Sequence, residues 1–230
     1  STLFPYTTLF RSPYRGAIAV TTMPMLRARE LAIIAARAHI DHAICDARIV
    51  AELHEAARAT GRLSRVATYG DGALERSMAQ RTDEFKNVTT ATDDVCLLAF
   101  TSGTTGNPKA TMHFHRDVLV MRDVVGRHLL ETTPDDIYTG SPPLGFTFGL
   151  GALLVFPLGG RGAAALVEQP SPDNLLDAIA RFRATALFTA PTAYRALAPL
   201  VAARDISSLR RCFSAETQPG PVVTRNRIRR

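Results

Sequence analysis

Apolar and polar positions follow two periods along this chain, and the period changes repeatedly from Gly16 onward. Short runs rich in β-branched residues indicate strands, whereas longer runs with apolar residues three and four positions apart indicate helices. The pattern predicts strands at residues 17–22, 42–45, 65–69, 95–101, 109–114, 136–140, 163–167, 184–189 and 209–215. It predicts helices at residues 25–38, 47–60, 116–130, 148–156 and 192–203, and one more that has Pro172 at its first position.

Strands that alternate with helices in this way predict an α/β fold with mainly parallel sheets built from βαβ units. We expect a first, partial α/β lobe at residues 13–92, and a strand hairpin with a second, partial α/β lobe at residues 93–216. Ser171 is the predicted N-cap of the helix at Pro172, because its hydroxyl can accept from a free helix amide and proline needs no amide partner there. Gly61 is expected to end the helix before it.

The two ends of the chain depart from the alternation. Residues 1–12 match none of the predicted elements and resemble translated sequencing-adapter sequence, so we expect a non-native leader there. Residues 217–230 contain prolines and then arginines where the alternation calls for another helix, so we expect an aberrant tail that results from a frameshift or truncation.

Composition and charge narrow the class of protein. The 230 residues are 46% hydrophobic and 21% charged, which suits a globular chain with an ample core. The net charge is +6, but residues 225–230 hold four of these charges and Arg11 a fifth, which leaves about +1 for residues 12–224. A basic groove for nucleic acid is therefore not expected.

Neither a membrane span nor a disulfide framework is expected. The apolar run at residues 148–160 is shorter than the ~20 residues that a bilayer requires and contains Pro157, so a buried helix is the better interpretation. The three cysteines, Cys45, Cys96 and Cys212, are far apart and lie among apolar residues, which favours reduced thiols in a cytoplasmic protein.

One loop stands out chemically, the stretch TSGTTGNPKA between the predicted strands at 95–101 and 109–114. Its hydroxyls, glycines and single cation are the groups that bind polyphosphate: Thr101, Ser102, Gly103, Thr104, Thr105, Gly106 and Lys109. A Walker A loop is disfavoured, because the lysine stands three positions after the second glycine and a strand follows in place of a helix. A hydroxyl-rich hairpin without a ligand is the alternative.

The loop and its surroundings, LAFTSGTTGNPKAT, resemble the phosphate-binding signature of the acyl-adenylate-forming superfamily of AMP-dependent synthetases and ligases. Four further segments fall in the family's order, at residues 21–49, 140–160, 187–197 and 209–216. The resemblance covers roughly residues 14–216 and is nearest to benzoate and 2-aminobenzoate–CoA ligases, so the chain is identified as an N-terminal fragment of such a ligase. Ala110, where the family usually has glycine, is a departure that we associate with aromatic acid ligases.

The resemblance implies ATP-dependent activation of an aromatic carboxylic acid to acyl-AMP and then to acyl-CoA, with ATP, Mg²⁺ and CoA as cofactors. Residues 101–106 and Lys109 would then hold the β- and γ-phosphates. The acid pocket would be lined by Phe146, Gly149, Ala190, Pro191 and Tyr194. For Phe146 and Tyr194, an ordinary place in the core or on a helix face is the alternative to pocket lining.

Other family features are missing from the sequence. The motifs for adenine and ribose, and the glycine expected between Ala215 and Glu216, are absent, as is the small domain that carries the adenylation lysine. We therefore expect no catalytic residue in this chain, no acyl-AMP formation by it alone, and no metal site, since the paired His113 and His115 have no third ligand. The alternatives are an aryl-acid adenylating module that serves a carrier protein and a noncatalytic nucleotide-binding protein.

Overall fold

The computed structural model describes residues 16–81, 86–101 and 108–214, and these form two compact units that divide between His115 and Arg116. The predicted leader at 1–12 and tail at 217–230 lie outside the described residues. The division differs from the predicted boundary between residues 92 and 93, because the strand at 95–101 pairs with the first strand of the chain. The hairpin therefore belongs to the first unit.

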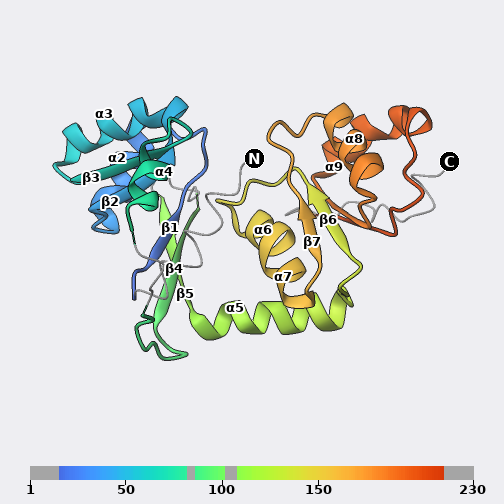
Figure 1. Cartoon of the computed structure of the whole chain (residues 1–230), viewed down its shortest axis with the longest axis horizontal. Helices are drawn as coiled ribbons and strands as arrows, with labels where there is room; N and C mark the ends of the chain where they lie inside the picture. The colour runs from blue at the N-terminus through green and yellow to red at the C-terminus, as the bar shows by residue number, and fades with distance from the viewer. Residues whose placement is uncertain (1–15, 82–85, 102–107, 215–230) are drawn as a thin grey trace. The chain divides into compact units, whose positions relative to one another are not determined.

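The first unit contains two small sheets (Figure 1). One has the order β1-β4-β5, in which β1 (Ala19–Thr21) and β4 (Val95–Thr101) are parallel and β5 (Lys109–Phe114) is antiparallel to β4. The other pairs β2 (His42–Asp46) with β3 (Arg65–Tyr69) in parallel. The expected βαβ alternation is present, and β4–β5 is the antiparallel hairpin that the sequence predicts.

Two helices form the core of the first unit. In α2 (Ala28–Arg37) the apolar face presents Leu31 and Ala35, and these pack against Ala56 of α3 (Val50–Thr60) and against Leu63. A 3₁₀ turn, η1 (Ala47–Ile49), precedes α3, and the side chain of Asp46 accepts from the amide of Arg48 at its start. The predicted end of α3 is confirmed, because Gly61 adopts a left-handed conformation with φ of 65°.

The helix α4 (Ala73–Ala79) was not predicted. It has seven residues, none of them buried, so it shows no apolar stripe for the sequence pattern to reveal. Its start is fixed by Asp71, whose carboxylate accepts from the amide of Ala73 at 2.9 Å.

The second unit is built on one parallel sheet with the order β7-β6-β8-β9. The strands are β6 (Ile137–Gly140), β7 (Ala163–Ala165), β8 (Ala186–Phe188) and β9 (Arg211–Phe213). On one face, α8 (Pro172–Phe182), α9 (Pro191–Leu197) and the 3₁₀ helix η4 (Ala198–Ala203) cover the sheet. Their side chains meet the sheet in a core made of Leu175, Leu176, Ile179, Ala184, Leu187, Tyr194, Leu197 and Leu209. Ser171 caps α8 as predicted, since its Oγ accepts from the amide of Asn174.

The other face carries an aromatic cluster around Phe188. This ring stacks on Phe213 with centroids 4.6 Å apart and meets Tyr138, Phe148 and Phe156 at larger distances. Phe148 lies in α6 (Thr147–Leu150) and Phe156 in α7 (Phe156–Gly160). With the π-helical segment η3 (Gly151–Val155) between them, these elements form the buried helix predicted at 148–156.

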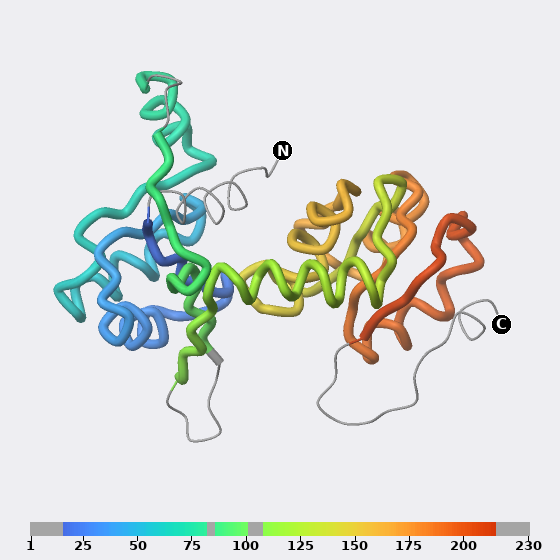
Figure 2. The backbone as a smooth tube through the Cα atoms, turned by 90° about the horizontal axis from the view of Figure 1, so that it is seen from below, coloured from blue at the N-terminus to red at the C-terminus, as the bar shows by residue number. Residues whose placement is uncertain are grey.

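The predicted helix at 116–130 runs as α5 (His115–Met121) and a π-helical segment η2 (Arg122–Leu129), which Figure 2 shows as one unbroken coil. The amide of Leu130 donates to the carbonyl of Val125, five residues back, which widens the turn. Two donors from Thr132, its amide and its hydroxyl, then satisfy the carbonyl of Gly126. None of the helices in the described part of the chain has both the length and the apolar character that crossing a bilayer demands.

Candidate functional site

The two ends of the glycine- and hydroxyl-rich loop are held together by strand pairing. Thr101, the last residue of β4, stands opposite Lys109, the first residue of β5, in the antiparallel ladder. The loop residues Ser102, Gly103, Thr104, Thr105 and Gly106 lie outside the described residues. Lys109 is exposed, and within the described part of the chain its ammonium forms no salt bridge. The hairpin thus places an exposed cation at the start of β5.

A contact that the sequence does not reveal lies beside this cation. The guanidinium of Arg37, in the last turn of α2, donates to the backbone carbonyl of Pro108 at 2.6 Å. The two residues are 71 positions apart, so no local pattern indicates the contact.

In the second unit, strand order marks a candidate site, which we call the binding edge. From β6 the chain crosses to β7 on one side, and from β7 it returns to β8 on the other side of β6. The loops that leave the carboxyl ends of β6 and β8 therefore diverge, and in open α/β sheets ligands bind in the crevice at such a switch point. The segments that begin at Ser141 and Thr189 are the ones that leave the sheet there.

A pair of hydroxyls joins β6 and β8 at this edge. Ser141 Oγ and Thr189 Oγ1 are 2.5 Å apart, and Thr189 is fully buried. The amide of Ser141 also donates to the carbonyl of Phe188, and the amide of Thr189 donates to that of Phe213, both at 3.1 Å. Sequence reasoning missed this pair, although the position of each residue at the end of a predicted strand was a usable signal.

Phe146 and Gly149 lie on the segment that follows β6. Phe146 is the N-cap residue of α6 and is 43% exposed. Gly149 is buried, and a Cβ placed on it would lie 2.1 Å from the carbonyl oxygen of Pro143. Only glycine lets α6 approach the Pro142–Pro143 turn so closely.

Ala190, Pro191 and Tyr194 lie on the segment that follows β8. Ala190 is the exposed N-cap residue of α9 and Pro191 occupies its first position, where a missing amide costs nothing. Tyr194 is buried in the core, and its hydroxyl donates to the carbonyls of Leu187 and Phe213 at 2.8 and 2.9 Å. Burial raises the pKa of the Tyr194 phenol. Tyr194 thus fastens α9 to β8 and β9, and its role as a pocket floor stays a prediction.

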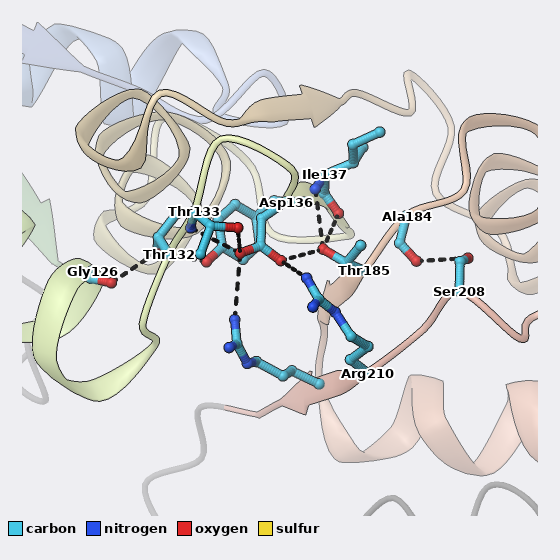
Figure 3. Close-up of polar contacts among 11 residues, drawn as sticks. Gly126, Thr132, Thr133, Asp136, Ile137, Ala184, Thr185, Ser208 and Arg210 are labelled. Atoms are coloured by element: carbon cyan, nitrogen blue, oxygen red, sulfur yellow. Dashed lines mark hydrogen bonds and ion pairs between the residues drawn. The ribbon is translucent and has the colours of Figure 1, made fainter.

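The opposite edge of the same sheet holds a charge cluster (Figure 3). Asp136 precedes β6 and is fully buried, and its carboxylate accepts from Thr185 Oγ1 at 2.6 Å and from the amide and hydroxyl of Thr133. Arg210 donates to it at 2.6 Å, and Arg211 lies 3.5 Å away. Burial raises the pKa of this carboxyl, but the hydrogen bonds from Thr185 and Thr133 and the nearby Arg210 outweigh burial and lower it. The cluster ties together the amino ends of β6, β8 and β9, away from the binding edge.

Metal ligation finds no support in the described ranges, which contain no group of three His, Cys, Asp or Glu side chains able to hold an ion. Mg²⁺ is therefore assigned to none of the described residues.

Comparison with known proteins identifies the family. A model of the AMP-binding enzyme family matches residues 7–229. The chain is 30% identical to the benzoate–CoA ligase of Thauera aromatica over 129 residues, which are 56% of this chain and 24% of that protein. It is 38% identical to the anthranilate–CoA ligase of Pseudomonas aeruginosa over 123 residues, which are 52% of this chain and 23% of that one. The chain thus matches about a quarter of the length of these curated relatives.

The fold agrees with a solved relative. The anthranilate CoA ligase AuaEII in complex with anthranoyl-AMP superposes with a TM-score of 0.86 and 27% identity, and the match covers 91% of this chain and 42% of that one. The predicted α/β fold with mainly parallel sheets, and the resemblance stated from the loop signature, are both confirmed. This chain belongs to the AMP-binding enzyme family.

Proposed function

We propose that this chain contributes the phosphate-binding hairpin and the acid-binding edge of an AMP-forming ligase for an aromatic carboxylic acid. In the first step an oxygen of the acid attacks the α-phosphorus of ATP, the bond to the bridging oxygen breaks, and pyrophosphate leaves with the bond electrons. In the second step the thiolate of CoA attacks the acyl carbon, and AMP leaves as the thioester forms. The proposal for the acid rests on two relatives that are named as ligases of benzoate and of anthranilate.

The observation that carries the proposal is the signature loop at the closed end of the β4–β5 hairpin. Negative charge grows on the pyrophosphate as it leaves, so prealigned donors and a cation at the β- and γ-phosphates lower the barrier. The hydroxyls and amides of residues 101–106 would supply the donors, and Lys109 the cation. Mg²⁺ would arrive as the complex with ATP and neutralise part of the same charge.

For the acid, the proposed site is the carboxyl edge of β6 and β8. Phe146, which is 43% exposed, would offer an aryl ring a flat apolar surface at this edge. Ala190 and Pro191 would border that surface with compact apolar side chains, and Gly149 would contribute by letting α6 pack closely on Pro143. Tyr194 would support the floor from beneath. No residue is assigned to CoA.

The phosphate half of the proposal is tested by pyrophosphate binding, measured by titration calorimetry on the whole chain. Lys109→Gln is expected to weaken the affinity about tenfold, which corresponds to about 1.4 kcal/mol. Lys86→Gln is a matched control, since it removes the same charge from an exposed lysine outside the hairpin. Equal affinities for Lys109→Gln and the unchanged chain would refute the assignment of Lys109.

The ligase half is tested separately, because this chain lacks motifs that the family uses for adenine and ribose. We expect the chain alone to show no benzoate- or anthranilate-dependent exchange of pyrophosphate into ATP. We expect a full-length protein containing this chain to show both that exchange and thioester formation with added CoA. Exchange by the chain alone would overturn the first expectation, and a full-length protein that releases no thioester would overturn the second.

A further inference from the structure

The hydrogen bond between Arg37 and Pro108 joins two elements of the first unit at a chemically significant place. Arg37 ends α2, and Pro108 immediately precedes Lys109, where β5 and its ladder with β4 begin. The bond therefore lies next to the cation assigned to the phosphates in the proposed function.

The acceptor of this bond has consequences for Lys109. Proline has no amide hydrogen, so its carbonyl is the only backbone hydrogen-bonding group that Pro108 offers. The carbonyl of Pro108 and the amide of Lys109 belong to one planar peptide group. A donor that holds the carbonyl thus also fixes the orientation of the Lys109 amide and the point from which the Lys109 side chain departs.

The donor is carried by a helix that packs in the core of the first unit, although the Arg37 residue itself is exposed. Two residues before Arg37, Ala35 is 1% exposed and packs in the core with Leu31 and Ala56. The guanidinium is charged, and hydrogen bonds from charged donors are stronger than those between neutral groups. The core of the unit is in this way connected to the start of β5.

A simpler role for Arg37 makes a different prediction. A cation in the last turn of a helix stabilises the carbonyl end of that helix whatever else it touches. Such a role involves α2 alone and leaves the backbone around Lys109 unaffected when Arg37 is replaced.

We propose that Arg37 is a positioning residue for Lys109, which it holds at the start of β5 in the place where a polyphosphate binds. The positioning of the backbone stands on the observed contact, and its benefit to polyphosphate binding rests on the proposed function. The ligand class is an inorganic or nucleotide polyphosphate, and pyrophosphate is the probe.

The test compares Arg37→Gln, Arg37→Lys and the control Arg29→Gln, which removes an exposed charge from the first turn of the same helix. Backbone hydrogen exchange of residues 109–114 is followed by mass spectrometry, and pyrophosphate affinity by calorimetry. For Arg37→Gln we expect faster exchange in this segment and an affinity about fivefold weaker. Arg37→Lys should recover part of the exchange protection and part of the affinity, and Arg29→Gln should leave the exchange rate and the affinity unchanged.

Each outcome decides a different point. Unchanged exchange at residues 109–114 in Arg37→Gln overturns the proposal, whether or not the chain binds pyrophosphate. An equal loss of affinity in Arg37→Gln and Arg29→Gln also overturns it, because general charge attraction then explains the effect. A third outcome is faster exchange in Arg37→Gln together with an unchanged pyrophosphate affinity in Lys109→Gln. It would retain Arg37 as an anchor of the backbone and refute the phosphate role of Lys109, which is part of the proposed function.

Discussion

Replacing Asp136 by asparagine removes the negative charge on which the amino ends of three strands converge. The change keeps the size of the side chain but turns one of its two acceptor oxygens into a donor. Both carboxylate oxygens accept hydrogen bonds, one from Thr185 and Arg210 and the other from Thr133, and the Arg211 guanidinium forms an ion pair with the second oxygen at 3.5 Å. The oxygen of the asparagine amide still accepts from the donors on one side, but its NH₂ group faces the donors on the other side.

The expected cost follows from what each donor can do afterwards. Arg210 is 47% exposed and rehydrates, and Thr185 has a second acceptor in the carbonyl of Ile137 at 3.4 Å. The amide of Thr133 and the less exposed Arg211 are less able to form hydrogen bonds with water in its place. One buried donor left unsatisfied, a weakened charge-assisted bond from Arg210 and a lost ion pair with Arg211 give a loss of about 3 kcal/mol in the free energy of unfolding.

The assay is urea unfolding followed by circular dichroism, with hydrogen exchange in β6, β8 and β9 to report on the second unit. Asp177→Asn is the control, since that carboxylate is 56% exposed and its ion pair with Arg204 contributes less than about 1 kcal/mol. The folded-state pKa of Asp136 is below its usual 3.8, so its contribution is complete above that value and is lost as the pH falls through the folded pKa. The reasoning is refuted if Asp136→Asn lowers the free energy of unfolding no more than Asp177→Asn does, or if the loss caused by Asp136→Asn is the same at about pH 2 as at neutral pH.

Two further predictions concern the binding edge. Tyr194→Phe removes the hydroxyl that donates to the carbonyls of Leu187 and Phe213, while the Phe213 carbonyl keeps its bond from the amide of Thr189, and the change is expected to cost about 1 kcal/mol in urea unfolding. Because the pKa of Tyr194 in the folded chain is raised above 10.0, the stabilisation that this residue gives should fall as the pH rises past that value. A difference in the free energy of unfolding between the unchanged chain and Tyr194→Phe that grows above this pH would contradict the expectation. Gly149→Ala places a methyl 2.1 Å from the Pro143 carbonyl and should lower the melting temperature by several degrees, about 2 kcal/mol in stability, whereas Gly61→Asn, at a left-handed position open to a side chain, should change it little. Equal melting temperatures for the two variants would show that the Pro142–Pro143 turn yields.

Local signals in the sequence were sufficient for most elements of the fold. The Ser171–Pro172 pair predicted the start of α8, and Gly61 predicted the end of α3. The apolar runs predicted each strand of the described residues within a few positions. The loop signature identified the family. The exposed helix α4 was missed because it buries no residue and so leaves no periodic trace.

Contacts between distant positions were beyond sequence reasoning. Asp136 meets Thr185 and Arg210, which are 49 and 74 positions away, and neither separation follows from a repeat or a motif. The same holds for the hydroxyl pair of Ser141 and Thr189, 48 positions apart. Such contacts depend on strand order, and the sequence indicates that strands exist without stating which are neighbours.

The hydroxyl pair has a consequence for redesign of the proposed acid site. Ser141 and Thr189 begin the two loops that border the binding edge, and each is the hydrogen-bond partner of the other. A graft that takes one loop from a relative with an alanine or valine at the matching position strands the remaining hydroxyl, and Thr189 is fully buried. Under the proposed function, specificity at this edge is therefore transferred by the two loops as a matched set, and library design should vary them jointly.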